Sequence, residues 1–248
     1  MSVPIPTPRI AATLILLRAG ASGLETLMIE RHTGLSFAPG ALVFPGGCLS
    51  QDDHARSGDG GLALRRTAIR ECFEECGILL ARGLDGSGLA ERERYRRRLL
   101  DGELDFSAML TSEGLVAADD LLVPFGHWVT PEIRPKRFDT LFFLAPAPPG
   151  QQAEPDGSEV VRCLWEHPSA ILQSANDGRA RLIFATRMNL ARLSRFATVA
   201  EALADASGQP VVRITPEWVE TESGAELRIP QGTGYSPCAV PAVVTDMA

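Results

Sequence analysis

Apolar positions change their spacing along the chain, which predicts strands followed by a helix in the first third. Residues 10–18 and 24–31 are apolar and β-prone, and the small residues between them predict a hairpin. Residues 42–44 predict another short strand, and residues 48–61 predict a polar loop. Residues 62–82 instead carry apolar side chains at helical spacing, which predicts a helix with Gly77 near its expected end.

The rest of the chain mixes both spacings. A second helix, whose interleaved Arg and Glu predict a solvated face, is expected at residues 89–100, and the longest helix at 183–206. We further expect short helical turns at 101–122, strands at 125–129, 138–145, 159–165, 211–215 and 226–229, a helix that starts at Pro168, and a tail without strands. Because strands and helices intermix, the expected fold class is α/β or α+β with a mixed sheet.

Composition places the chain among globular proteins and narrows its partners. Its 248 residues, 45% hydrophobic and 22% charged, suit one large domain that buries a full core. Acidic residues outnumber basic ones by 31 to 24, a net charge of −7, which argues against a general binder of nucleic acid or of membrane surfaces. An anionic substrate would therefore need metal ions or a local Arg cluster.

The lack of recognisable targeting signals and the irregular spacing of the cysteines favour a cytoplasmic location. Residues 1–9 contain three Pro and predict an extended leader without a signal-peptide core. The longest apolar run, residues 14–17, is too short to span a membrane, and the last three residues are not a peroxisomal address. The five Cys are irregularly spaced, so we expect no disulfide framework and a reducing compartment.

Three carboxylates crowd the helix predicted at residues 62–82. Glu71 and Glu75 are four residues apart, with Glu74 between them at the next helical position, so all three lie near one face. Like charges at this spacing repel one another, and a divalent cation removes the repulsion. Carboxylate oxygens suit Mg²⁺ or Mn²⁺. A solvated acidic face, with Arg70 as a surface partner, is the alternative interpretation.

The residues around these carboxylates favour the metal site. Phe44-Pro45-Gly46-Gly47 precedes the helix, and Arg70-Glu71-x-x-Glu74-Glu75-x-Gly77 closes it. This pattern resembles the Nudix box, which implies a Nudix fold, with a mixed curved sheet sandwiched between helices, that holds metal ions against a pyrophosphate. The resemblance implies metal ligands at Glu71, Glu74 and Glu75, catalytic roles for Glu71, Glu74 and the orienting Arg70, and substrate contacts at Gly46 and Gly47.

The chain departs from the box in one place. More residues separate Gly47 from Arg70 than the family pattern has. Counted forward from Gly47, the first acidic position of the box falls on Asp53, whereas counted back from Arg70 it falls on Leu62 and is lost. In the family this acid supports the loop and the Arg, so either alternative leaves the metal ligands in place.

Further segments resemble the coenzyme A and acyl-coenzyme A diphosphatase branch of the superfamily. Arg31, Gly40 and the Phe-Pro-Gly-Gly run match its upstream motif, although Ser36 stands where a second Arg is expected. Residues 127–131 and 137–145 resemble the peroxisomal acyl-coenzyme A type, which also carries an insertion in its box. The resemblance implies a Nudix domain at 10–205 with a helical insert at about 83–122, and an extension at 206–248 packed on the same domain.

On this resemblance we expect a Mg²⁺- or Mn²⁺-dependent hydrolase that splits coenzyme A or acyl-coenzyme A into 3′,5′-adenosine bisphosphate and (acyl-)phosphopantetheine, and that forms a homodimer. A Nudix hydrolase of another nucleoside diphosphate derivative and a non-catalytic binding module remain as alternatives. Arg31 and Arg137 are candidates for binding substrate phosphate, each with a structural ion pair as its alternative. The general base is expected to be Glu71 or a distant acid, Glu159 or Glu154.

Overall fold

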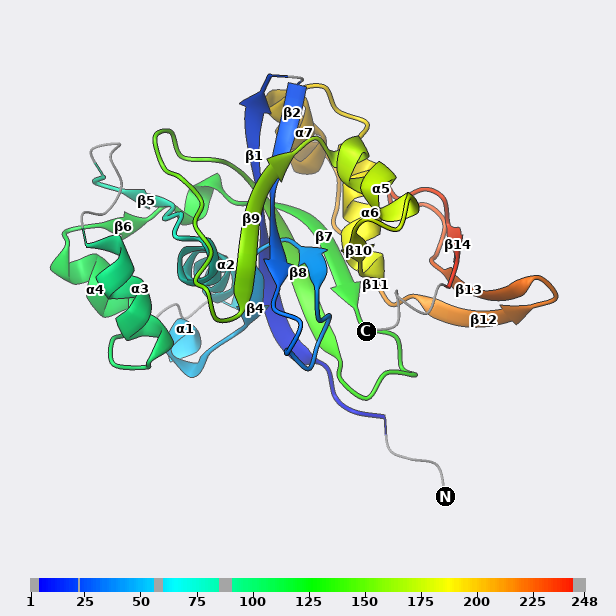
Figure 1. Ribbon diagram of the computed structural model, residues 1–248, viewed down its shortest axis with the longest axis horizontal. Coiled ribbons are helices and arrows are strands. Elements are labelled where there is room, and N and C mark those ends of the chain that lie inside the picture. Colours follow the sequence, from blue (N-terminus) through cyan, green and yellow to red (C-terminus); the bar gives the residue numbers. More distant parts are fainter. Residues whose placement is uncertain (1–4, 22, 56–59, 85–90, 243–248) are drawn as a thin grey trace.

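A mixed β-sheet runs through the centre of the molecule (Figure 1). The computed structural model describes residues 5–21, 23–55, 60–84 and 91–242. The strands of this sheet are β1 (Arg9–Gly20), β2 (Gly23–Arg31), β3 (Ala41–Val43), β4 (Gly46–Cys48), β7 (Val123–Val129), β8 (Phe138–Pro146), β9 (Val160–Glu166), β10 (Arg181–Leu182) and β11 (Arg213–Ile214). In the described part of the chain their order is β10-β3-β2-β1-β8-β7-β11, while β4 pairs with β1 and β9 with β2.

The central strand β1 explains the mixed character of the sheet. It forms the predicted hairpin with β2, where Leu17 lies opposite Thr26, and it runs parallel to β8, where Leu14 lies opposite Phe143. Its residues 11–17 are buried without interruption because both faces of the strand are covered. Alternate residues point to opposite faces, so Leu14 and Leu16 enter one core and Ile15 and Leu17 enter the other.

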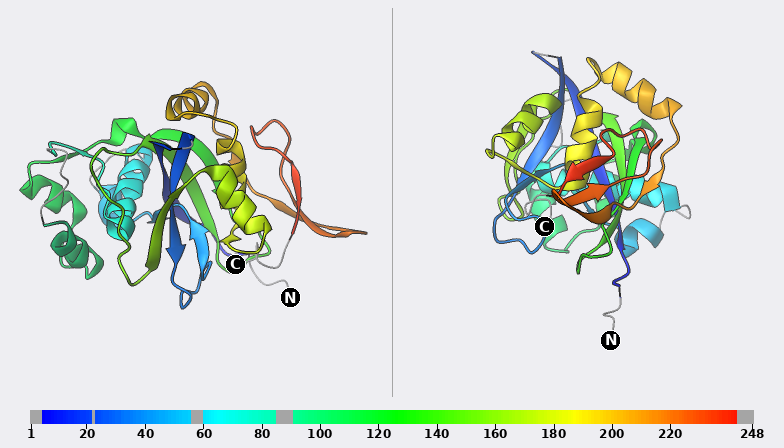
Figure 2. Two further views of the ribbon diagram at one scale, coloured as in Figure 1. Left: turned by 45° about the horizontal axis from the view of Figure 1, so that its top comes forward. Right: turned by 90° about the vertical axis from the view of Figure 1, so that its right-hand side faces the viewer.

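Helices cover both faces of the sheet (Figure 2). On one side lies α2 (Gly60–Cys76), whose buried Ala68, Ile69 and Phe73 join the first core. On the other side lie α5 (Pro168–Asn176), α6 (Phe184–Leu193) and α7 (Val199–Gly208), which contribute to the second core. The strands and helices therefore form the sandwich that the sequence predicts.

Two smaller groups of elements flank this sandwich (Figure 1). Beside α2 lie α3 (Arg92–Leu100), α4 (Phe106–Ser112), the short pair β5 (Ala81–Arg82) and β6 (Val116–Ala117), and the 3₁₀ turn η1 (Asp119–Leu121). At the opposite end, β12 (Glu217–Thr221), β13 (Gly224–Arg228) and β14 (Ala239–Pro241) form a separate sheet. Leu227, Ile229 and Tyr235 of this region pack into the second core.

The helix predicted at residues 62–82 is shorter in the structure. It ends at Cys76, because Gly77 has a φ of 73° and its N–H donates to the carbonyl of Phe73. Residues 81–82 belong to β5 instead. The loop predicted at residues 48–61 also contains a short helix, α1 (Gln51–Ala55). Burial of residues 78–80 in the first core explains why their apolar run resembled a continuing helix.

The single helix predicted at residues 183–206 is wrong, since the structure has two helices there. α6 ends at Leu193 and α7 begins at Val199. The Thr198 side chain accepts a hydrogen bond from the N–H of Glu201, and the Glu201 carboxylate accepts one from the N–H of Ala197. This reciprocal capping is a start signal that the sequence contains and that the helical periodicity obscured.

The prediction of a tail without strands is wrong, because β14 lies after residue 229, and β12 is a further strand between the two predicted late strands. The five cysteines are free thiols, in agreement with the prediction of no disulfides. None of the helices in the described residues combines the length and the hydropathy that a membrane span requires.

Candidate active site

Helix α2 presents its carboxylates to a cavity of about 490 Å³ between α2, β4 and the start of β8. The apolar face of α2, which includes Ile69, Cys72 and Phe73, packs on the sheet. Glu71 and Glu75, one turn apart, both line the cavity, together with Glu159 from the segment before β9. The amphipathic pattern of α2 thus fixes which side chains reach the cavity.

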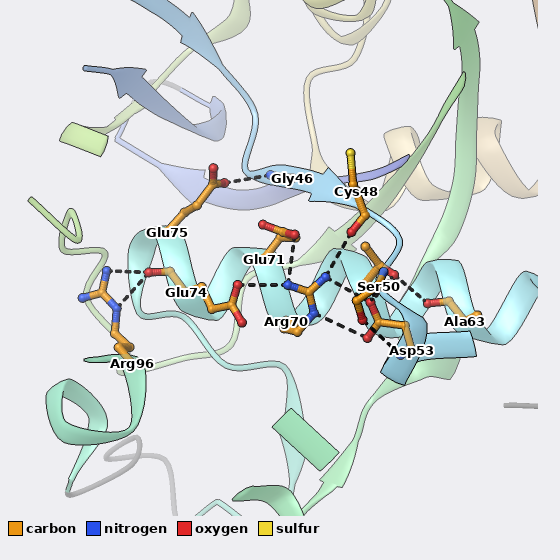
Figure 3. Close-up of polar contacts among 11 residues, drawn as sticks. Gly46, Cys48, Ser50, Asp53, Ala63, Arg70, Glu71, Glu74, Glu75 and Arg96 are labelled. Atoms are coloured by element: carbon orange, nitrogen blue, oxygen red, sulfur yellow. Dashed lines mark hydrogen bonds and ion pairs between the residues drawn. The ribbon is translucent and has the colours of Figure 1, made fainter. Parts of the chain in front are cut away.

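Arg70 connects the carboxylates to the loop before the helix (Figure 3). Its Nη1 lies 3.0 Å from a carboxylate oxygen of Glu71 and 3.0 Å from one of Glu74. Its Nη2 lies 3.0 Å from Asp53 and donates to the carbonyl of Cys48 at 3.2 Å. Burial alone would lower the pKa of Arg70, but Glu71, Glu74 and Asp53 together raise it, so the guanidinium stays charged.

Asp53 therefore lies where the first acidic position of the box is expected to act. Its carboxylate is 7% exposed, receives a hydrogen bond from the Thr67 hydroxyl at 2.9 Å and accepts one from the N–H of Ser50. Although burial opposes it, Arg70 and the hydrogen bonds with Ser50 lower the pKa of Asp53. The carboxylate thus fastens α1 to α2 and holds Arg70 in place.

The two glycines of β4 bring the backbone close to the carboxylates. The N–H of Gly46 donates to Glu75 at 2.8 Å. A Cβ at Gly47 would lie 2.5 Å from the Glu71 carboxylate, and a Cβ at Gly46 would lie 2.5 Å from the carbonyl oxygen of Ala12. At Gly46 a Cβ would collide with backbone, and at Gly47 it would displace the Glu71 carboxylate, which is why glycine suits both positions.

Burial makes the charge of Glu71 and Glu75 costly. It raises the pKa of both side chains, and the neighbouring Arg70 and Arg31 offset this only in part. The Arg31 guanidinium lies 3.8 Å from Glu75 and 4.0 Å from Glu159, so it stands between the two acids and faces the cavity. A further cation beside Glu71 and Glu75 would stabilise their charged forms.

Glu74, predicted as a metal ligand together with Glu71 and Glu75, occupies a different environment from these two residues. It does not line the cavity and instead holds Arg70, while its backbone carbonyl accepts hydrogen bonds from Arg96. Burial raises the pKa of Glu74 to about 7, against the effect of Arg70. Within the described residues, no three His, Cys, Asp or Glu side chains form a ready-made metal cluster.

Arg137 is a correction to the predicted substrate contacts. It is 8% exposed, and it donates to the carbonyls of Thr130 at 3.1 Å and Pro6 at 2.9 Å. Both acceptors are backbone atoms, so Arg137 fastens residues 5–8 to the loop between β7 and β8. It is absent from the cavity lining, which instead includes its neighbours Lys136 and Phe138.

The Arg run of α3 agrees only in part with the predicted solvated face. Arg92 and Arg94 pair with Glu154 and Glu91 at the surface. Arg96, however, is buried and donates to the backbone carbonyls of Glu74 and Glu154. It ties the insert to the end of the carboxylate helix. A single buried Arg among solvated ones leaves no signal in the sequence.

Comparison with known proteins places this site in a family. The NUDT19 Nudix domain family matches residues 57–193, which is more than half of the chain. The chain belongs to the NUDT19 Nudix domain family. A crystal structure of a Nudix hydrolase from Alicyclobacillus acidocaldarius is 30% identical, with a TM-score of 0.75 over 84% of this chain and 100% of that one. The fold is therefore the Nudix fold.

Two curated relatives share the family and carry a named activity. Acyl-coenzyme A diphosphatase NUDT19 of Gallus gallus is 26% identical over 76% of this chain and 68% of the relative. The protein of the same name from Homo sapiens is 27% identical over 73% of this chain and 63% of the relative. The match thus spans less than two thirds of the length of the human relative. Nudix hydrolases as a class cleave diphosphate bonds and generally use divalent metal ions.

The donor atoms of this Nudix domain suit such an ion. Mg²⁺ is commonly held by one or two carboxylates, with water and substrate phosphate completing its shell. Glu71 and Glu75 supply two carboxylates on one cavity, and their raised pKa values show that their charge lacks sufficient compensation. Both the chemistry and the electrostatics of this pair therefore fit a divalent cation.

Proposed function

We propose that this Nudix domain is a divalent-metal-dependent hydrolase that cleaves the diphosphate of coenzyme A or of an acyl-coenzyme A. The observation that carries the proposal is the cavity that Glu71, Glu75 and Arg31 line beside Gly46 and Gly47. Its volume of about 490 Å³ lies in the usual range for a small-molecule site. The names of the NUDT19 relatives support the substrate class.

The proposed reaction forms a bond from water oxygen to one phosphorus and breaks the bond from that phosphorus to the bridging oxygen. Glu71 and Glu75 would hold the divalent ion, which when bound would supply Lewis-acid stabilisation and a lowered pKa of the attacking water. Arg31 is placed to bind a diphosphate oxygen between Glu75 and Glu159. Arg70 stays charged and holds the Glu71 carboxylate toward the cavity.

The proton of the attacking water needs a carboxylate on the same cavity. Glu71 and Glu159 both meet this condition. Glu71 is held by Arg70, whereas the Glu159 side chain is 54% exposed and faces Arg31. The variants Glu71→Gln and Glu159→Gln distinguish these two candidates. Removal of the general base is expected to abolish the acidic limb of the pH–rate profile, whereas removal of the other glutamate is expected to leave that limb unchanged.

The test of the function is a substrate panel of coenzyme A, an acyl-coenzyme A, ADP-ribose and a nucleotide sugar, each with Mg²⁺, with Mn²⁺ and with EDTA. The expected result is metal-dependent release of 3′,5′-adenosine bisphosphate, lost in Glu75→Gln and retained in Glu103→Gln, whose side chain is exposed after α3. Turnover of only the other compounds would discard coenzyme A as substrate. Absence of turnover for all four would overturn the hydrolase.

A further inference from the structure

Basic side chains outnumber acidic ones on the wall of the cavity, although the chain as a whole carries a net charge of −7. Four basic residues and three acidic ones line it. Arg31 faces Glu75 and Glu159, as described above. The other three, Arg9, Arg134 and Lys136, make no ion pair with any acid of the described residues. Three cations without acidic partners therefore share one cavity.

The fold brings these three cations together from two segments. Arg9 begins β1 and lies opposite Phe138, while Arg134 and Lys136 belong to the loop that leads into β8. The N–H of Arg9 donates to the carbonyl of Arg137 at 2.9 Å, which joins the two segments. Arg9 and Lys136 both lower the pKa of the Cys48 thiol, against the dominant effect of its burial, so both lie near the end of β4.

A hydroxyl and two aromatic rings lie beside the three cations on the wall of the cavity. Lys136 Nζ donates to the Ser36 hydroxyl at 3.1 Å and lies 5.9 Å from the centre of the Phe138 ring. The rings of Phe37 and Phe138 are 4.9 Å apart and also line the cavity. Partial burial lowers the pKa of Arg134, because no neighbouring acid offsets the loss of water. An anionic group would supply the missing partner.

Arg9 lies at a defined separation along β1 from the strand position beside the carboxylates of α2. Gly47, which touches Glu71, pairs with Ala12 of β1. Arg9 is three residues further along β1, and a strand rises about 3.3 Å per residue, so the separation along the strand is about 10 Å. One substrate can therefore place its diphosphate at the carboxylates and a second anionic group at the cations.

We propose that Arg9, Arg134 and Lys136 form a subsite for a ribose phosphomonoester, which selects nucleoside diphosphate derivatives that carry this extra phosphate over those that lack it. This subsite rests on the proposed function, which supplies a substrate with an adenosine end. The subsite places that end on the side of the cavity next to β8. Charge-assisted hydrogen bonds from Arg to phosphate are stronger and more directional than neutral ones, so they discriminate well.

The test compares kcat/KM for coenzyme A and for 3′-dephospho-coenzyme A, with NADPH and NADH as a second pair that carries the phosphate at the 2′ position. The wild type is expected to prefer coenzyme A by at least about tenfold, the effect of one charged hydrogen bond. Arg134→Gln and Lys136→Gln are expected to reduce that preference toward unity. A matching preference for NADPH would assign the subsite to ribose phosphates in general, and its absence would restrict it to the 3′ position.

Arg97→Gln is the matched control, because Arg97 is exposed on α3, is absent from the cavity lining and makes no ion pair within the described residues. It is expected to leave the preference unchanged. Equal kcat/KM values for coenzyme A and 3′-dephospho-coenzyme A in the wild type would overturn the subsite while the hydrolase stands.

Binding measurements keep the subsite testable if the hydrolase itself fails. Calorimetric titration with 3′,5′-adenosine bisphosphate and with 5′-AMP is expected to show tighter binding of the bisphosphate, and Lys136→Gln is expected to remove the difference. Equal affinity of the wild type for the two nucleotides would overturn the subsite independently of any turnover.

Discussion

The Asp53 carboxylate lies 3.0 Å from the Arg70 guanidinium, although the two residues are 17 positions apart in the sequence. The first part of the inserted segment folds into α1 and carries this carboxylate back to α2. Thr67 donates a second hydrogen bond to it from α2 itself. The insertion in the box therefore lengthens the path between Gly47 and Arg70 and still delivers an acid to the Arg.

We predict that Asp53→Asn weakens both stability and turnover. It leaves the partly buried Arg70 without one of its counter-charges, and breaking a largely buried ion pair costs about 3 kcal/mol, or about 6–12 °C in Tm for a chain of this size. Asp52→Asn is the control, because Asp52 is exposed on the same short helix. Thermal unfolding and kcat/KM check the prediction; equal Tm values for the two variants would contradict it.

Features that depend on neighbouring residues can be predicted from the sequence, whereas features that depend on distant contacts cannot. The hairpin of β1 and β2 and the carboxylate helix follow local rules of periodicity and turn chemistry, so the sequence predicts them, whereas the Gly46–Gly47 pair is predicted from its resemblance to a family motif. The role of Arg137 depends on its distant acceptor Pro6, and that of Arg96 on Glu154, so sequence spacing carries no signal for either.

The cationic side of the cavity is hidden from the sequence for the same reason. Arg9 lies in a segment expected to be an extended leader. Arg134 and Lys136 lie between two predicted strands, in a loop that carries no motif. Only the parallel pairing of β1 with β8 brings them together. The long-range contacts of a mixed sheet thus decide which charged residues meet.

Substitutions of the two glycines of β4 are expected to affect different properties, stability at Gly46 and catalysis at Gly47. In Gly46→Ala the new Cβ meets backbone at Ala12, which cannot give way, so we expect a loss of about 1–3 kcal/mol in stability. In Gly47→Ala the Cβ meets the Glu71 carboxylate, a side chain that moves, so we expect a folded protein with reduced kcat. Gly60→Ala meets nothing within 4 Å and is the control. Similar Tm values for Gly46→Ala and Gly60→Ala would refute the prediction.

The three glutamates of α2 are expected to differ in their effect on catalysis. Glu71 and Glu75 line the cavity, and changes to supporting residues of a metal site already cost 10- to 100-fold, so we expect Glu71→Gln and Glu75→Gln to lose at least about 100-fold in kcat/KM. Glu74→Gln keeps both cavity carboxylates and is expected to lose less. Steady-state kinetics at several Mg²⁺ concentrations measure this, and a larger loss for Glu74→Gln would place Glu74 among the ligands.

Substitution of Arg137 is expected to reduce stability, whereas substitution of Arg31 is expected to weaken substrate binding. Arg137→Met removes two charged hydrogen bonds to backbone carbonyls, so Tm is expected to fall by an amount equivalent to about 2 kcal/mol, with KM unchanged. Arg31→Met removes a cation from the cavity, so KM is expected to rise while Tm changes less. Chemical denaturation and kinetics on the same samples distinguish the two. A raised KM in Arg137→Met would restore it as a substrate contact.

Asp139 is expected to make stability depend on pH below neutrality. It accepts hydrogen bonds from Arg213 at 2.8 Å and contacts His127 Nε2 at 2.5 Å, which ties β8 to β7 and β11. Although burial opposes it, these contacts hold the pKa of Asp139 below its ordinary value. A carboxylate with a lowered pKa in the folded state stabilises that state above its unfolded pKa of about 4, and the stabilisation is lost as pH falls through the folded value.

The variant Asp139→Asn is therefore expected to have a lower Tm than the wild type at pH 6, and the difference is expected to shrink steadily as the pH falls below about 4. Asp101→Asn, exposed after α3 and without an ion pair in the described residues, serves as the control and is expected to show a small difference at every pH. Thermal unfolding followed by circular dichroism from pH 3 to pH 7 measures both. A Tm difference for Asp139→Asn that stays constant over this range would show that Asp139 contributes packing and not charge, since only the charged form depends on pH.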